Sequence, residues 1–229
     1  MKNSIIIALD GHAGCGKSTT AKLVAQRLNY AYVDTGAMYR AVTLYLLNQG
    51  IPIESPEKVE SALSDISIRF AYDEASESNH TWLNGQDVEK EIRTMRVTGK
   101  VSEVSAISAV RRFLVAQQQE MGKEKGIVVD GRDIGTVVFP EAELKVYMTA
   151  SMEARARRRQ VQLEGKGRKV PLQEIMDDLA HRDGVDSSRS DSPLKKADDA
   201  HIVDTSHKSI DGQVSEIVDL AKSAMMQPS

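Results

Sequence analysis

The sequence contains one cysteine, Cys15, among 229 residues. A single thiol excludes an internal disulfide framework and is typical of proteins of the reducing cytosol. Long apolar runs are also missing. The run SIIIALD near the N-terminus is too short for a signal peptide or a membrane span, and no other segment approaches the roughly 20 apolar residues that a span needs. The sequence therefore predicts a cytoplasmic protein without a membrane partner.

Aromatic residues are scarce, at 4%, and the formal net charge is −3. Neither value favours a surface for nucleic acid, because such surfaces combine positive charge with stacking side chains. The hydrophobic content of 41% is ordinary for a globular protein, and 229 residues allow one substantial core with an appended subdomain.

Compact apolar runs alternate with amphipathic segments along most of the chain. This order predicts an α/β fold with a parallel sheet. The expected strands are 5–10, 31–34, 126–130, 144–148 and 201–204, and the expected helices are 18–28, 37–48, 108–123, 151–163, 172–181 and 210–224.

The middle of the chain has a different pattern. Segments 67–73 and 81–88 alternate apolar and polar residues, and Asn84-Gly85 is a strong hairpin signal. We expect a small inserted subdomain with antiparallel strands at 60–99, between core segments 1–59 and 100–229. The segment 164–169, EGKGRK, is expected to be mobile and to belong to a lid at about 155–172.

The stretch GHAGCGKST fits the pattern G-x-x-x-x-G-K-[ST] between a predicted strand and a predicted helix. Glycines let successive N–H groups point at phosphate oxygens, and the helix N-terminus adds positive potential. Lys17 is expected to reach the β- and γ-phosphates of ATP, and Ser18 to ligate Mg²⁺. The loop residues predicted to bind ATP are Gly11, His12, Ala13, Gly14, Cys15, Gly16, Lys17, Ser18 and Thr19.

His12 and Cys15 allow a second interpretation, a metal pair or a thiol nucleophile. A zinc site usually needs four ligands, and the chain has no other cysteine. We therefore interpret both as tolerated side chains in a loop that works through its backbone.

The phosphate loop alone does not say what happens to the nucleotide. The guanine motif N-K-x-D and the signature L-S-G-G-Q are absent, which leaves a small kinase or an ATP-driven switch. A kinase needs further cations around the transferred phosphoryl group. Arg40 and Arg132 follow predicted strands that end at Asp34 and Asp130. Because ligands bind beyond the carboxyl ends of parallel strands, we expect Gly11, Asp34 and Asp130 around one crevice.

Arg182, Asp186 and Arg189 have the spacing of one helix face, although Gly184 and Ser187-Ser188 weaken the helix prediction. Arginines from separate segments are interpreted as a shared anion site. The cluster Arg155, Arg157, Arg158 and Arg159 is interpreted as a solvated basic face or as part of a mobile lid over ATP.

Several motifs together resemble the bacterial cytidylate kinases: GHAGCGKST, DTGAMYR, EIRT, DGRDIGTVVFP, the segment 182–189 and PLKKADDAHIVDT. The resemblance covers nearly the whole chain. It implies the transfer of a phosphoryl group from ATP to CMP or dCMP with Mg²⁺. It also implies a five-stranded parallel core of the P-loop nucleoside monophosphate kinase type, with an enlarged monophosphate-binding region and a lid.

The resemblance also assigns roles to individual residues. Arg40, Arg132 and Arg189 look like the clamp on the acceptor phosphate, and Ser102, Arg111 and Asp133 look like the cytosine readers. Arg182 and Asp186 look like ribose contacts, and Arg155 and Arg158 look like lid cations. Thr35 stands where other members have serine. The residues given catalytic roles are Lys17, Arg132 and, as partners of Lys17 or of the Mg²⁺ shell, Asp34 and Asp130.

Two rival functions remain open: a kinase for a different small molecule on the same scaffold, and an ATP switch that moves a partner. No heptad run or long apolar stripe demands a second subunit, so a monomer is expected.

Overall fold

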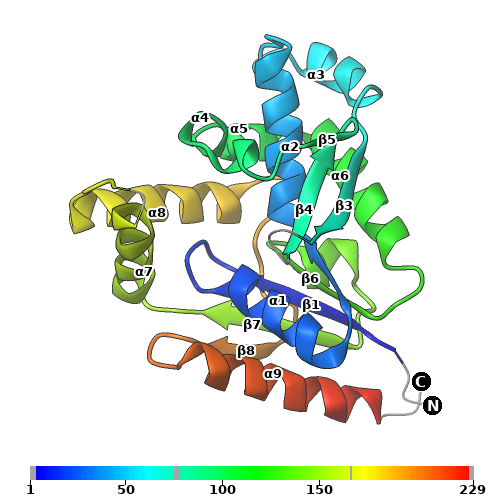
Figure 1. Ribbon diagram of the computed structural model, residues 1–229, viewed down its shortest axis with the longest axis vertical. Helices are drawn as coiled ribbons and strands as arrows, with labels where there is room; N and C mark the ends of the chain where they lie inside the picture. The colour runs from blue at the N-terminus through cyan, green and yellow to red at the C-terminus, as the bar shows by residue number, and fades with distance from the viewer. Residues whose placement is uncertain (1–3, 75–77, 166, 227–229) are drawn as a thin grey trace. The chain divides into compact units, whose positions relative to one another are not determined.

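The computed structural model describes residues 4–74, 78–165 and 167–226. These residues form two compact units (Figure 1). The first contains Met1–Val33 and Met121–Ser229, and the second contains Asp34–Glu120. The subdomain predicted at 60–99 falls within the second unit, and its boundaries stay a prediction.

The first unit is built on a five-stranded sheet with the order β2-β6-β1-β7-β8. The buried apolar run of β1 pairs in parallel with β6 on one side and β7 on the other, and β8 extends the sheet beyond β7. The predicted parallel sheet is thus confirmed. The bounds are β1 Ile6–Gly11, β2 Ala31–Asp34, β6 Ile127–Gly131, β7 Leu144–Thr149 and β8 His201–Asp204.

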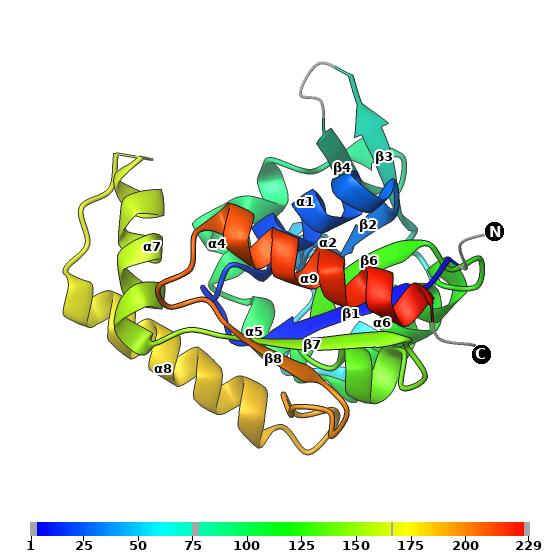
Figure 2. The same ribbon diagram turned by 90° about the horizontal axis from the view of Figure 1, so that it is seen from below.

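Helices cover this sheet and extend from it (Figures 1 and 2). Side chains of α1 and α9 bury the main core against the strands, with Ile7, Val128, Met148 and Ile217 fully buried. A smaller apolar cluster, which includes Ala156 and Leu179, joins α7 to α8. The helices are α1 Lys17–Leu28, α7 Met152–Glu164, α8 Leu172–Ser188 and α9 Ile210–Met225, and a π-helix, η2, spans Ile134–Val138.

Helix α8 is longer than the sequence predicts. It continues from Leu172 through Gly184 to Ser188, so the doubt about its continuity was wrong. A glycine costs a helix only about 1 kcal/mol, and Ile175 and Leu179 are buried on the same helix. Arg182 and Asp186 therefore lie one turn apart on a continuous helix, and Arg189 occupies its C-cap position.

The second unit combines short helices with an antiparallel sheet of order β3-β4-β5. Asn84 and Gly85 have φ values of 48° and 82° at the turn between β4 and β5, which confirms the predicted hairpin. The elements are α2 Thr35–Asn48, α3 Pro56–Leu63, β3 Ile68–Asp73, β4 Ser78–Leu83, β5 Gln86–Asp87, the 3₁₀ helix η1 Glu91–Arg93, α4 Met95–Thr98, α5 Val101–Ser105 and α6 Ser108–Met121.

Within the described ranges, no helix has both the length and the apolar character needed to cross a membrane. Part of the segment that was expected to be mobile, Lys166, lies outside the described residues.

Candidate active site

The phosphate loop joins β1 to α1 and depends on its glycines. Gly11, Gly14 and Gly16 have φ values of 143°, 80° and 96°, a region that other residues rarely adopt. A Cβ atom on Gly11 would lie 2.1 Å from the carbonyl oxygen of Met148 on β7. Larger residues are therefore excluded at this position, and the backbone can fold closely over the end of the sheet.

Lys17 is the first residue of α1 and is buried, with 5% of its surface exposed. Its ammonium group donates to the carbonyl oxygens of Gly11, at 2.6 Å, and His12, at 2.8 Å. Burial lowers the pKa of Lys17, and the nearby charge of Arg132 lowers it further. The loop thus folds around a cation whose own burial is unfavourable, which is typical of a group retained for binding anions.

Ser18 is connected to the end of a neighbouring strand. Its hydroxyl donates to one carboxylate oxygen of Asp130, at 2.8 Å, and the Tyr32 hydroxyl donates to the other, also at 2.8 Å. Asp130 lies on β6 opposite Leu9 of β1, two residues before the loop begins. Asp130 is thus hydrogen-bonded to Ser18, and its predicted role beside Lys17 or in the Mg²⁺ shell stays a prediction.

Asp186 on α8 joins two predicted clamp residues. Its carboxylate accepts from Arg132 Nε at 2.7 Å and lies 3.2 Å from Arg189 Nη2. Burial alone would raise the pKa of Asp186, but the charges of Arg132 and Arg189 hold it below its usual range. Arg182 is nearby: burial lowers its pKa, and so does the charge of Arg132. The convergence of DGRD and the end of α8, expected from the sequence, occurs within the first unit.

Asp133 follows Arg132 directly and is also buried, at 4% exposure. It occupies the N-cap position of η2 but makes no capping hydrogen bond with its side chain. The first N–H groups of η2 instead donate to Asp10, a residue that the sequence analysis did not single out.

The basic helix α7 contacts the phosphate loop. Arg155 donates to the carbonyl oxygen of Ala13 at 3.2 Å and to Asp183 of α8 at 2.7 Å. Arg158 donates to the carbonyl oxygen of Cys15 at 3.4 Å and to the Thr205 hydroxyl at 3.1 Å. Two of the four arginines are thus held on the loop, whereas Arg157 is exposed and pairs with Glu153.

The two unusual loop residues have structural partners. Cys15 is fully buried in the main core. His12 Nδ1 lies 3.2 Å from Asp183 Oδ1, which links the loop to α8. Within the described residues, no group of three or more histidine, cysteine, aspartate or glutamate side chains is arranged to hold a metal. The contact with Asp183 gives His12 a specific partner, whereas the sequence predicts only a tolerated side chain.

In the second unit, Asp34 organises a pair of arginines. One carboxylate oxygen accepts from Ala37 N at the start of α2, at 2.8 Å. The other accepts from Arg40 at 3.1 Å and from Arg93 at 3.3 Å. Burial would raise the pKa of Asp34, but the charges of Arg40 and Arg93 lower it. Arg93 was missed as a site residue, although it lies in the motif EIRT.

Gly36 leaves room for this arrangement, because a Cβ atom there would crowd Arg40 Nη1, at 3.0 Å, and Asp34 Oδ1, at 3.2 Å. The neighbouring Thr35, at the serine position of the resemblance, is buried as the first residue of α2.

The predicted base readers also lie in the second unit. Arg111 on α6 is 2% exposed, and its guanidinium donates to the carbonyl oxygen of Ser105 at 3.1 Å. The Ser105 hydroxyl donates to the carbonyl oxygen of Ser102, so Ser102 and Arg111 belong to one hydrogen-bonded cluster on α5 and α6. The Arg111 guanidinium lies over the ring of Tyr39, 5.7 Å from its centroid. Asp133, the third predicted reader, belongs to the first unit.

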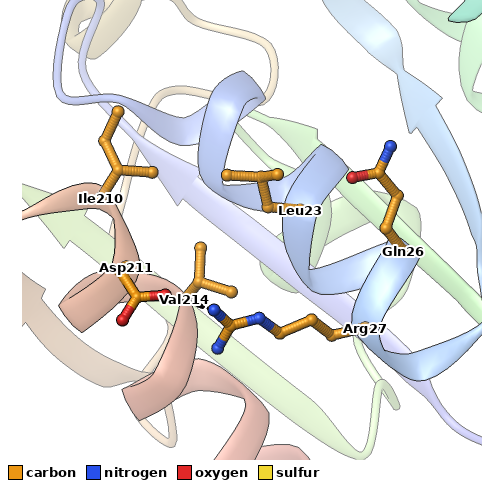
Figure 3. Close-up of a pocket in the computed structure, with 6 residues that line it drawn as sticks. All are labelled: Leu23, Gln26, Arg27, Ile210, Asp211 and Val214. Atoms are coloured by element: carbon orange, nitrogen blue, oxygen red, sulfur yellow. Dashed lines mark hydrogen bonds and ion pairs between the residues drawn. The ribbon is translucent and has the colours of Figure 1, made fainter. Parts of the chain in front are cut away.

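A separate groove of about 560 Å³ lies between α1 and α9 (Figure 3). Leu23, Ile210 and Val214 supply its apolar surface, and Gln26, Arg27 and Asp211 supply its polar surface. Arg27 and Asp211 form an ion pair across it. None of these residues belongs to the predicted site.

The parallel sheet with its phosphate loop, buried lysine and serine–aspartate pair defines a P-loop nucleotide-binding protein. A family model described as cytidylate kinase matches residues 7–223. The chain therefore belongs to the cytidylate kinase family, which confirms the resemblance. Membership implies ATP as co-substrate and a nucleotide as acceptor.

Individual relatives agree with this assignment. A cytidylate kinase of Parabacteroides distasonis is 51% identical over 212 residues, which are 91% of this chain and 93% of the relative. A cytidylate kinase of Bacteroides fragilis is 52% identical over 210 residues, which are 90% of this chain and 91% of the relative. A solved structure of an uncharacterized protein from Eubacterium ventriosum has a TM-score of 0.52 and 13% identity, and covers 96% of this chain and 99% of that one. This likeness concerns the fold alone.

Proposed function

We propose that this protein transfers the γ-phosphate of ATP to CMP or dCMP and releases ADP with CDP or dCDP. The observation that carries the proposal is the pairing, within one unit, of a phosphate loop with a second cationic group. Arg132 and Arg189 share Asp186, and Arg132 is close enough to Lys17 to lower the pKa of the lysine. A donor phosphate and an acceptor phosphate each need such a site.

The reaction is proposed to proceed in line, without a covalent intermediate. Phosphoryl transfer depends mainly on positioning and on neutralising charge at the transferred group. Lys17 and the loop N–H groups hold the ATP phosphates, and Arg132 and Arg189 hold the acceptor phosphate. Arg155 and Arg158, with Arg182 of α8, complete the positive surroundings.

The second unit is proposed to contribute acceptor-binding residues. Arg40 binds phosphate, and Asp34 orients its guanidinium group. This role is supported by the Nε atom of Arg40, which is buried without a hydrogen-bond partner among the described residues. Ser102 and Arg111 read the base, a role that is also proposed for Asp133 of the first unit, and Thr35 binds the acceptor. A carboxylate accepts from the amino group at cytosine N4. Because uracil has a carbonyl oxygen there, UMP is expected to be rejected.

Mg²⁺ is part of the proposal, and the residues present fit it. Ser18 and Asp130 offer oxygen atoms, the ligands that this hard cation prefers, and Mg²⁺ commonly uses few protein ligands together with phosphate oxygens. When bound, the ion would neutralise phosphate charge. The hydroxyl of Ser18, held by Asp130, is the group we propose to contact it.

Two further properties are proposed from the sequence, a cytoplasmic location and a monomeric state. Light scattering after gel filtration tests the second. A mass near 25.2 kDa is expected, and a mass of about twice that value contradicts the monomer.

A panel of nucleoside monophosphates tests the proposed function. In a coupled assay of ADP release, CMP and dCMP should give the highest kcat/KM, and AMP, GMP and UMP should be poor acceptors. Faster reaction of AMP, GMP or UMP would contradict the assignment of the base. ATP turnover that does not depend on any of the five monophosphates would favour another acceptor or an ATP switch.

Arg189→Ala is expected to lower kcat/KM for CMP at least about tenfold, since a charge-assisted hydrogen bond contributes roughly 1.5–3 kcal/mol. The KM for ATP should barely change. Arg157→Ala is the matched control, because Arg157 is an exposed arginine that pairs with Glu153 on the same helix. If binding of ATP weakened by the same factor, Arg189 would belong to the ATP site or to the lid.

A further inference from the structure

Asp10 is a buried carboxylate to which the proposed reaction assigns no role. It lies on β1 directly before the phosphate loop and is 5% exposed. Burial raises its pKa to about 6, although the N–H groups of Gly135 and Ile134 favour its ionised form. Burying a carboxylate is unfavourable unless its hydrogen bonds are satisfied. The two bonds that satisfy Asp10 therefore indicate what it does.

Both bonds go to the backbone directly after Arg132 and Asp133. Asp10 Oδ1 accepts from Ile134 N and Oδ2 accepts from Gly135 N, each at 2.8 Å. These are the first N–H groups of η2, which have no partner inside the helix. Asp133 occupies the N-cap position without capping η2. Asp10 thus supplies the cap from a different strand.

The preceding end of the same loop is also fixed at Asp10. In the parallel ladder of β1 and β6, Asp10 is aligned with Gly131, the residue before Arg132. The segment with Arg132 and Asp133 therefore begins at the ladder beside Asp10 and ends at the Asp10 carboxylate. A Cβ atom on Gly135 would be in ordinary contact with Asp10 Oδ2, at 3.4 Å, and tight against the Lys145 side chain, at 3.2 Å.

We propose that Asp10 is a positioning residue for acceptor binding: its carboxylate fixes the loop that presents Arg132 and Asp133. This rests on the proposed function of that loop. Because Asp10 also leads into Gly11, one strand end sets both the phosphate loop and the acceptor loop. Errors of about 1 Å in such positioning cost about a hundredfold in rate.

Asp10→Asn tests the proposal with almost no change in volume. The amide nitrogen cannot accept, so either Ile134 N–H or Gly135 N–H would face a donor. We expect kcat/KM for CMP to fall at least about tenfold and the KM for ATP to change less than about twofold. Glu143→Gln is the matched control, because Glu143 accepts from Ile6 N–H, at 2.8 Å, at the other end of β1. Glu143→Gln should leave kcat/KM for CMP and the KM for ATP unchanged.

A second measurement uses the unmodified protein. Amide exchange at Ile134 and Gly135 should become faster, relative to intrinsic rates, as the pH is lowered through about 6, because a protonated carboxyl keeps one good acceptor. The Ile6 amide is the internal reference, since the pKa of its acceptor Glu143, despite partial burial, is held low by Lys125. Amide exchange is measured in place of a pH profile of activity, because a nucleotide phosphate titrates near the same pH and would obscure the titration of Asp10 in such a profile.

The charged or titratable groups around Asp10 are Asp133, Lys17 and Tyr147. Asp133→Asn should shift the midpoint of the exchange profile to lower pH, since the charge of Asp133 raises the pKa of Asp10. A midpoint that stays in place would mean that a group other than Asp10 is titrating, which contradicts the proposal.

Wild-type kcat/KM for CMP in Asp10→Asn would overturn the proposal. An equal loss for ATP and CMP would also overturn it, since Asp10 would then support only the phosphate loop. If the variant does not fold, the exchange profile decides, and a flat profile at both amides contradicts the proposal. Failure of the unmodified protein to phosphorylate CMP would overturn the proposed function, while the exchange result would still show whether Asp10 fixes the loop.

Discussion

Lys17→Met is expected to lower kcat/KM for CMP phosphorylation about a hundredfold to a thousandfold, at saturating ATP and Mg²⁺. Preorganised charge at the transferred group is usually the largest contribution to such reactions, and one lost donor in a buried site costs about 10²–10³. Lys17 is buried, and its ammonium group is already held by Gly11 and His12 carbonyl oxygens at the loop. Methionine has a similar length and no charge, so the loss measures the charge.

The same substitution should not destabilise the fold. Burial lowers the pKa of Lys17, which means that the folded state disfavours its charged form. That penalty is present at any pH below the unfolded pKa of lysine, which includes neutral pH, and methionine removes it. Thermal unfolding should therefore give an unchanged or higher Tm. Lys208→Met is the matched control, a partly exposed lysine that pairs with Glu216.

A lower Tm in Lys17→Met would show that the two carbonyl bonds of Lys17 support the loop more than burial opposes it. Activity within about tenfold of the unmodified protein would contradict its role at the transferred phosphate.

The parallel core could be predicted from the sequence because its signals are local. A short apolar run followed by Gly11 and Lys17-Ser18 defines strand, loop and helix within about 25 residues, and Asn84-Gly85 defines a hairpin within two. The doubt about helix continuity near Gly184 was wrong for the opposite reason. Local propensity there is outweighed by the packing of Ile175 and Leu179 against α7.

The missed site residues depend on contacts between distant segments. Asp10 reads locally as the polar end of a buried strand, and its partners are 124 and 125 residues away. Arg93 shares Asp34 with Arg40 across a separation of 59 residues, and Asp183 joins the phosphate loop to Arg155. No spacing rule predicts such pairs. The available signal was that Asp10 lies beside Gly11, and that Arg93 and Asp183 lie inside segments already quoted for the resemblance.

Asp186→Asn is expected to lower kcat for CMP about a hundredfold, with a smaller effect on the KM for CMP. Asp186 fixes the guanidinium groups of Arg132 and Arg189, and asparagine keeps its shape without its charge. The acceptor phosphate itself neutralises the two arginines when it binds, so binding is partly preserved. Their positions are no longer fixed, and in-line transfer depends on position.

The variant should also be less stable, because breaking a buried ion pair leaves uncompensated charge and typically costs about 3–5 kcal/mol. Burial opposes ionisation of Asp186, but Arg132 and Arg189 lower its pKa below the unfolded value. Its contribution to stability is therefore present above the unfolded pKa and is lost as the pH falls through the folded pKa. The difference in unfolding free energy between the two proteins should shrink over that acid range. Asp199→Asn, at an exposed aspartate paired with Lys145, is the control.

Comparison of CMP with dCMP separates this positioning role from the ribose contact that the resemblance implies for Asp186. A carboxylate that binds the 2′-hydroxyl contributes to CMP and not to dCMP, so its loss should affect CMP alone. A carboxylate that orients Arg132 and Arg189 acts on the phosphate, which the two acceptors share, so both should lose the same factor. Equal losses in kcat support the positioning role. A loss confined to CMP, seen mainly in KM, contradicts it and assigns Asp186 to the sugar.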